Sequence, residues 1–208
     1  MKNNALKKTL DKLFGGLPMS WPAVLLYAVG AAVLTAVFLV VPVFKDTSFY
    51  RMGVYLEAWI LFAVLIMANC KKPLESAVKV FVFFLVSQPL IYLLQVPFSW
   101  QGWNLFSYYG RWFILTLLTF PAAFAGWYIN KRSWLSVLIL APVLAFLGSI
   151  VYSSMSETIS SFPHLLLTAV FCLLQIAAYV FVFFPKSSQK LVGLAVPAAT
   201  IVALALIA

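Results

Sequence analysis

The 208-residue sequence has few of the residue types on which most enzyme active sites depend. It contains one histidine, two cysteines and five acidic residues, and these are scattered along the chain. A hydrolytic metal centre needs several His, Cys or carboxylate ligands in one place, and this spacing assembles no such cluster. Neither a glycine-rich phosphate loop nor a paired acidic motif for magnesium diphosphates is present. We therefore expect no metal and no cofactor, and the sequence favours a protein that is not an enzyme.

Ser161 and His164 are the one neighbouring pair of a nucleophile and a base. A serine nucleophile needs both a base and an oxyanion hole within reach. Pro163 lies between the two residues, and the segment predicts a loop rather than a helix that would align them. We therefore assign no catalytic residue. An intramembrane lipid-modifying enzyme remains the weakest of three functional hypotheses.

Charged residues are also scarce, at 9% of the chain, whereas 64% of residues are hydrophobic and the mean hydropathy is +1.04. About a quarter of the residues of a soluble domain are charged, so this composition indicates an integral membrane protein. A helical crossing of the bilayer takes roughly 20 apolar residues. Runs of about that length occupy residues 21–44, 50–70, 77–97, 107–129, 134–153, 164–184 and 191–208. The sequence predicts an all-α bundle of seven transmembrane helices, with six possible, that forms one domain over residues 19–208.

Residues 1–18 precede the first apolar run and show a different pattern. Apolar side chains fall on one helical face at Leu6, Leu10, Leu13, Phe14 and Leu17, opposite Lys7, Lys8, Asp11 and Lys12. Gly15, Gly16 and Pro18 then end the helix. This segment predicts a short amphipathic helix that lies on the cytoplasmic headgroups, with docking of a partner protein as the alternative.

The basic residues predict the orientation. Eleven of the fourteen lie before the first run or in every second gap after it. Because positive residues concentrate in short cytoplasmic loops, we expect the N-terminus in the cytoplasm and the C-terminus outside. The net charge of +9 then reflects lysines that set the orientation of the helices and contact lipid headgroups. It does not indicate nucleic-acid binding. Short loops and this lysine bias are typical of a multi-pass protein of a bacterial cell membrane.

Two spans carry alanine at every fourth position: Ala28, Ala32 and Ala36 in the first, and Ala195, Ala199 and Ala203 in the last. Small residues let helix backbones approach closely in lipid, so we expect tight contacts along both stripes. The size, the basic charge and the alanine-rich first span resemble the small six-helix substrate-binding components of energy-coupling-factor transporters. That resemblance implies a vitamin-like ligand near the outer face and a partner packed on the first helix. The seventh span departs from that plan, and no residue is assigned a role from it.

Glu57 and Arg111 are charged residues inside predicted spans, and the predicted orientation puts both in the outer half of the membrane. A carboxylate at membrane depth costs about 2.5 to 3.5 kcal/mol, part of which a neighbouring arginine would recover. Either the two form an ion pair that fixes the second and fourth spans together, or they line a ligand site.

Gln88 and Gln175 fall near the middle of their spans, where hydrocarbon cannot satisfy an amide. Pro89 follows Gln88 and frees a backbone carbonyl, which also requires a partner. The two amides either bind each other across a helix interface or line a polar cavity.

The predicted outer loop at residues 99–109 is uncharged and rich in aromatic residues. It contains Trp100, Trp103, Tyr108 and Tyr109. Such rings favour the membrane interface in any case, but they would also suit a lid over an outward-facing pocket. A further outer loop is expected at residues 154–164.

Two further functional hypotheses follow. The first is solute transport or substrate binding in an outward-facing pocket in the outer leaflet, which takes a small molecule from the outer side. The second is a noncatalytic accessory or assembly subunit with a membrane or cytoplasmic protein partner.

Overall fold

The computed structural model describes residues 2–161 and 165–207, and every regular element within those ranges is a helix. The α-helices are α1 (Lys2–Leu13), α2 (Trp21–Val40), α3 (Ser48–Val54), α4 (Leu56–Asn69), α5 (Pro73–Gln95), α6 (Tyr109–Gly126), α7 (Trp134–Ser161), α8 (Leu166–Phe183) and α9 (Ser187–Ile207). Short 3₁₀ segments are η1 (Pro42–Phe44), η2 (Val96–Phe98), η3 (Gly102–Tyr108) and η4 (Trp127–Lys131). Within the described residues, six helices are long and apolar enough to cross a membrane. The fold is that of an all-helical, multi-pass membrane protein, as predicted.

The seventh predicted span, residues 50–70, is not one straight helix. It consists of α3 and α4, which meet at Tyr55 and are bent by 61°. Tyr55 has extended backbone angles, φ −91° and ψ 170°, which end α3 before α4 begins. α3 packs against α2 and α8, whereas α4 packs against α5 and α6. The break at Tyr55 thus lets α3 contact α2 and α8 while α4 contacts α5 and α6.

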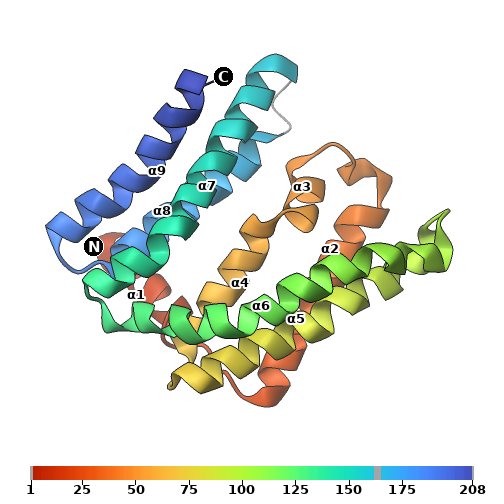
Figure 1. Ribbon diagram of the computed structural model, residues 1–208, viewed down its shortest axis with the longest axis horizontal. Coiled ribbons are helices and arrows are strands. Elements are labelled where there is room, and N and C mark those ends of the chain that lie inside the picture. Colours follow the sequence, from red (N-terminus) through yellow and green to blue (C-terminus); the bar gives the residue numbers. More distant parts are fainter. Residues whose placement is uncertain (1, 162–164, 208) are drawn as a thin grey trace.

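The long helices form two groups of three (Figure 1). α5 packs along both α2 and α6, and α7 packs along both α8 and α9. The groups meet at one end of the molecule, where η4 links α6 to α7, and they splay apart towards the other end. α3 and α4 lie between them.

The alanine stripe of the first span packs as predicted, whereas the stripe of the last span does not. Ala28, Ala32 and Ala36 are buried on α2, which packs against α5 within the chain. The three alanines of α9 are exposed. α9 instead approaches α7 where Gly148 meets Pro197: a Cβ on Gly148 would lie 2.9 Å from the Pro197 Cα. The prediction overlooked this contact because it relied on a repeated small residue, and a single glycine facing a proline has no period.

Two predicted outer loops are largely helical. α7 continues to Ser161 instead of ending at residue 153, which places Glu157 on a helix. Its polar residues find partners there: the Thr158 hydroxyl donates to the Ser154 carbonyl (2.7 Å), and Glu157 pairs with Arg51. Within residues 99–109, η3 replaces the expected irregular loop. Pro163 and His164, and with them the Ser161–His164 pair, lie outside the described residues.

The N-terminal helix contacts the bundle through its C-terminal end. Phe14 is buried and packs edge-on against Tyr179 and Phe183 of α8, with ring centroids 6.0 and 5.7 Å apart. The Asn69 amide at the end of α4 donates to the Leu13 carbonyl (2.7 Å) and accepts from the Leu17 amide (2.7 Å). These contacts fix the segment that joins α1 to α2. Contact of α1 with lipid headgroups stays a prediction.

Candidate functional site

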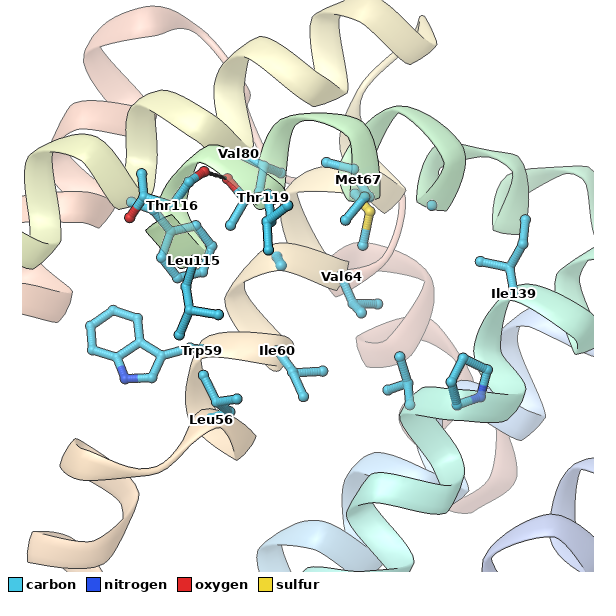
Figure 2. Close-up of a pocket in the computed structure, with 18 of the residues that line it drawn as sticks. Leu56, Trp59, Ile60, Val64, Met67, Val80, Leu115, Thr116, Thr119 and Ile139 are labelled. Carbon is cyan, nitrogen blue, oxygen red and sulfur yellow. Dashed lines mark hydrogen bonds between the residues drawn. The ribbon is translucent and has the colours of Figure 1, made fainter. Parts of the chain in front are cut away.

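A pocket of about 410 Å³ lies between α4, α6 and α7, with α5 behind it; we call it the lateral pocket. Its walls are almost entirely apolar. They include Leu56, Trp59, Ile60 and Val64 from α4, Leu115 and Thr116 from α6, and Ile139 from α7, and Figure 2 shows these side chains around the hollow. The volume falls within the range of small-molecule sites, about 300 to 1,000 Å³. The splayed arrangement of the two helix groups thus leaves room for a ligand.

A second pocket of about 450 Å³, the end pocket, lies between α3, the C-terminal part of α5 and the start of α6. Its lining is more polar and includes Tyr50, Tyr92, Gln95 and Tyr108. Three further residues, Trp59, Gln88 and Trp112, line both pockets. The two pockets therefore adjoin, and an almost wholly apolar pocket lies beside a more polar one.

Gln88 is the polar group at the junction of the two pockets. Its side chain is 4% exposed, and the amide nitrogen Nε2 has no hydrogen-bond partner. The hydroxyls of Thr116 and Thr119, which also face the lateral pocket, donate to carbonyls of their own helix, Trp112 O (2.9 Å) and Thr116 O (2.6 Å). A buried amide without a partner costs about 1 to 3 kcal/mol. Gln88 thus has an unused donor in the wall that a ligand could engage.

The lateral pocket opens between apolar side chains in the membrane-spanning parts of α6 and α7. Leu115 and Leu118 near the middle of α6 are 42% and 57% exposed, and Pro142 of α7 is also exposed. All three line the pocket. In a bilayer, exposed residues at this depth contact acyl chains rather than water. The chemistry of this mouth therefore suits a molecule that arrives from lipid.

Glu57 and Arg111 do not meet. Glu57 is fully buried at the second residue of α4, and neither carboxylate oxygen has a hydrogen-bond partner. Arg111 is exposed on α6. The arginine that is paired is Arg51 of α3, whose Nη1 donates to Glu157 Oε2 (2.6 Å) and whose Nη2 donates to Ser153 Oγ (3.1 Å). Of the two alternatives left open by the sequence, the ion pair between spans two and four does not form, since Glu57 is buried inside the bundle and Arg111 is exposed.

Gln175 and Gln88 also lie apart. The Gln175 Nε2 donates to the backbone carbonyl of Glu57 (3.2 Å), and its Oε1 accepts from the Tyr179 hydroxyl (2.8 Å). Gln175 therefore ties α8 to α4 and does not bind Gln88, whereas Gln88 lines a cavity. Their shared depth in the membrane did not bring them together because α5 and α8 belong to different helix groups.

The aromatic segment contributes one residue to the pockets. Tyr108 lines the end pocket, and Tyr109 packs against Tyr92 with ring centroids 6.1 Å apart. Trp100 and Trp103 are 93% and 68% exposed and line neither pocket. They do not form a lid in this structure.

Trp59 and Trp112, which line both pockets, were not singled out from the sequence. Each lies within an apolar run, where a tryptophan is an ordinary residue. Only the packing of α4 against α6 gives them a common cavity. No sequence signal would have found them.

Among the described residues, no group of three or more His, Cys, Asp or Glu side chains could hold a metal ion. The two pockets present apolar walls, aromatic rings and the unpartnered amide nitrogen of Gln88. Comparisons with models of protein families, with curated proteins and with solved structures find no match to this chain.

Proposed function

We propose that this protein binds, and in a transport cycle carries, an amphipathic small molecule at the two adjoining pockets. The apolar part of the ligand occupies the lateral pocket and its polar end lies beside Gln88 in the end pocket. One observation carries the proposal: an apolar pocket with lipid-facing residues in its wall adjoins a more polar pocket across a buried, unpartnered amide. The predicted orientation puts the end pocket on the outer side, and the lateral pocket extends from it towards the cytoplasmic ends of α4 and α6, where Met67 and Gly126 line it.

The apolar walls favour an amphipathic ligand over the general small solute expected from the sequence. A hydrophilic solute would leave its polar groups unsatisfied against the walls of the lateral pocket. An amphipathic molecule buries its chain there and keeps its polar end near Tyr92, Gln95 and Tyr108. Glu57 lies behind this wall, since its neighbours Leu56 and Trp59 line the pockets and Glu57 does not.

Photolabelling tests this proposal with a long-chain fatty acid that carries a diazirine in its chain. Thr116→Trp fills the lateral pocket, and Leu117→Trp places the same side chain on α6 at an exposed residue that lines neither pocket. We expect Thr116→Trp to reduce labelling of α4 and α6 about tenfold, equivalent to about 1.4 kcal/mol, and Leu117→Trp to leave it unchanged. Mass spectrometry of the labelled peptides gives the site.

Gln88→Leu keeps the approximate size of the side chain and removes the amide. We expect weaker labelling than in the parent protein at equal probe concentration, because the polar end of the fatty acid loses a donor. Equal labelling of all four proteins would contradict the proposal. So would labelling that is spread over every lipid-facing helix.

The alternative function, a noncatalytic accessory or assembly subunit, is supported by the surface of α9. Only 11% of the residues in its most apolar 18-residue stretch are buried, and its alanine stripe at Ala195, Ala199 and Ala203 is exposed. Such a stripe permits close approach of another helix. A stable complex with a second membrane protein that is lost in Ala199→Leu, together with no labelling of the pockets, would favour this function.

A further inference from the structure

Glu57 occupies an unusual place for a carboxylate. It follows the break between α3 and α4 by two residues, its side chain has no exposed surface, and neither oxygen has a hydrogen-bond partner. Charged side chains within membrane-spanning segments are rare and usually paired. A buried ion that lacks both water and a partner costs several kcal/mol, so such a group takes up a proton or binds a cation instead.

The surroundings of Glu57 distinguish between a proton and a metal cation. The Glu57 carboxylate accepts no hydrogen bond and is shielded from water, and the Arg51 guanidinium lies within electrostatic range of it. A metal cation needs several oxygen ligands, and no cluster of acidic, His or Cys residues provides them within the described part of the chain. Arg51 would also repel a metal ion. A proton neutralises the carboxylate and needs no further ligand.

The other titratable groups near Glu57 are either neutral or already paired. Cys172 of α8 lies within electrostatic range of both Glu57 and Arg51. Tyr179 of α8 donates its hydroxyl proton to Gln175. Glu157 of α7 forms an ion pair with Arg51.

The remaining charges on the helices around α4 lie elsewhere. On α5, Glu75 and Lys79 pair with each other at the start of the helix. On α6, Arg111 is exposed. No described cation donates a hydrogen bond to the Glu57 carboxylate.

We infer that Glu57 is a proton-binding site at the break between α3 and α4 and that its carboxyl group is protonated in this structure. Discontinuous membrane helices commonly place their ion sites where the backbone is broken. Release of the proton breaks the Glu57 O–H bond, passes the proton to water and leaves a carboxylate. Arg51, whose Nε is buried without a partner, is the nearby group that would stabilise this carboxylate. The site does not depend on what occupies the lateral pocket.

Infrared spectroscopy of the full-length protein in a maltoside detergent, which has no carbonyl group, tests this inference. A protonated carboxylic acid gives a C=O stretch that carboxylates lack. We expect one such band at neutral pH in the wild-type protein, a shift of that band in D₂O, and its loss at high pH. Glu57→Gln is neutral and nearly isosteric, and it should lack the band at neutral pH.

Glu75→Gln is the matched control, since it removes a carboxylate that is paired with Lys79, and it should keep the band. Three results would overturn the inference. The wild type could lack an acid band at neutral pH, the band could persist in Glu57→Gln, or the band could fail to shift in D₂O. A carboxylate signal that responds to sodium or magnesium rather than to pH would identify a cation site instead. If Glu57→Gln did not fold, the pH titration and the D₂O shift of the wild-type band would still decide between these outcomes.

Discussion

At the scale of single residues, polar side chains inside the bundle have two different roles. Gln175 has a protein partner on each side of its amide, whereas Gln88 and Glu57 each have buried polar atoms without any. A satisfied amide stabilises the contact of α8 with α4, and an unsatisfied one costs stability that a ligand or a proton can recover. This difference separates structural residues from candidate functional ones.

The hydrogen bond that Tyr179 donates to Gln175 within α8 should be measurable by a double-mutant cycle. Gln175→Leu leaves the buried Tyr179 hydroxyl without its acceptor, which should lower the free energy of unfolding by about 1 to 3 kcal/mol. Adding Tyr179→Phe removes that hydroxyl and should recover part of the loss. Reversible unfolding in mixed micelles gives the free energies. Losses that simply add in the double variant would show that the two side chains do not interact.

At the scale of helices, the contacts that hold the second group together depend on residues without a large side chain. α7 and α9 meet at Gly148 and Pro197, and α9 begins near the Phe184 ring, which lies 2.3 Å from where a Cβ on Gly193 would be. Neither position has room for an added methyl group. The approach of α9 is therefore sensitive to single methyl groups.

Gly148→Ala should force α7 and α9 apart and destabilise the protein by about 1 to 3 kcal/mol, the usual cost of overpacking. Gly30→Ala on α2 is the matched control, because nothing lies within 4 Å of its Cβ. It should be neutral or slightly stabilising, since alanine favours a helix over glycine by about 0.5 to 1 kcal/mol. Thermal unfolding midpoints in detergent compare the two variants. Equal midpoints would contradict the close contact of α7 with α9.

At the scale of the whole molecule, the predicted orientation can be tested because both cysteines are buried. Burial raises the pKa of the Cys70 thiol to about 11. The negative charge of Glu75 adds to this effect, and the positive charge of Lys79 opposes it. Maleimides react with the thiolate, and a raised pKa keeps the thiolate scarce at neutral pH. The wild-type protein should therefore stay unlabelled in membranes.

Trp100→Cys and Lys186→Cys report on opposite ends of the bundle, and both positions are exposed. In intact cells, a membrane-impermeant maleimide should label Trp100→Cys, whereas Lys186→Cys should react only after the membrane is permeabilised. Gel shifts of the labelled protein provide the measurement. The reverse pattern would invert the orientation and place the end pocket on the cytoplasmic side.

Composition and apolar run length determined the class of this protein and the approximate position of each long helix, because the bilayer fixes how many apolar residues a crossing needs. They missed the break at Tyr55 and the extension of α7 to Ser161, since hydropathy is insensitive to backbone angles and α7 has polar residues near its end that find partners. Of the predicted site residues, Gln88 and Tyr108 line the pockets, and Glu57, Arg111, Trp100, Trp103, Tyr109 and Gln175 do not.

The sequence alone therefore decided that this chain is a multi-pass helical membrane protein, since a high density of apolar side chains is a local property. Only the tertiary structure decided which polar groups lack partners. Partnership depends on which helices lie side by side, and lipid provides no hydrophobic driving force that would let a sequence pattern specify those neighbours. The sequence left open whether Glu57 pairs with Arg111 or lines a site; in the structure it is buried, lines neither pocket and lies near Arg51, which pairs with Glu157.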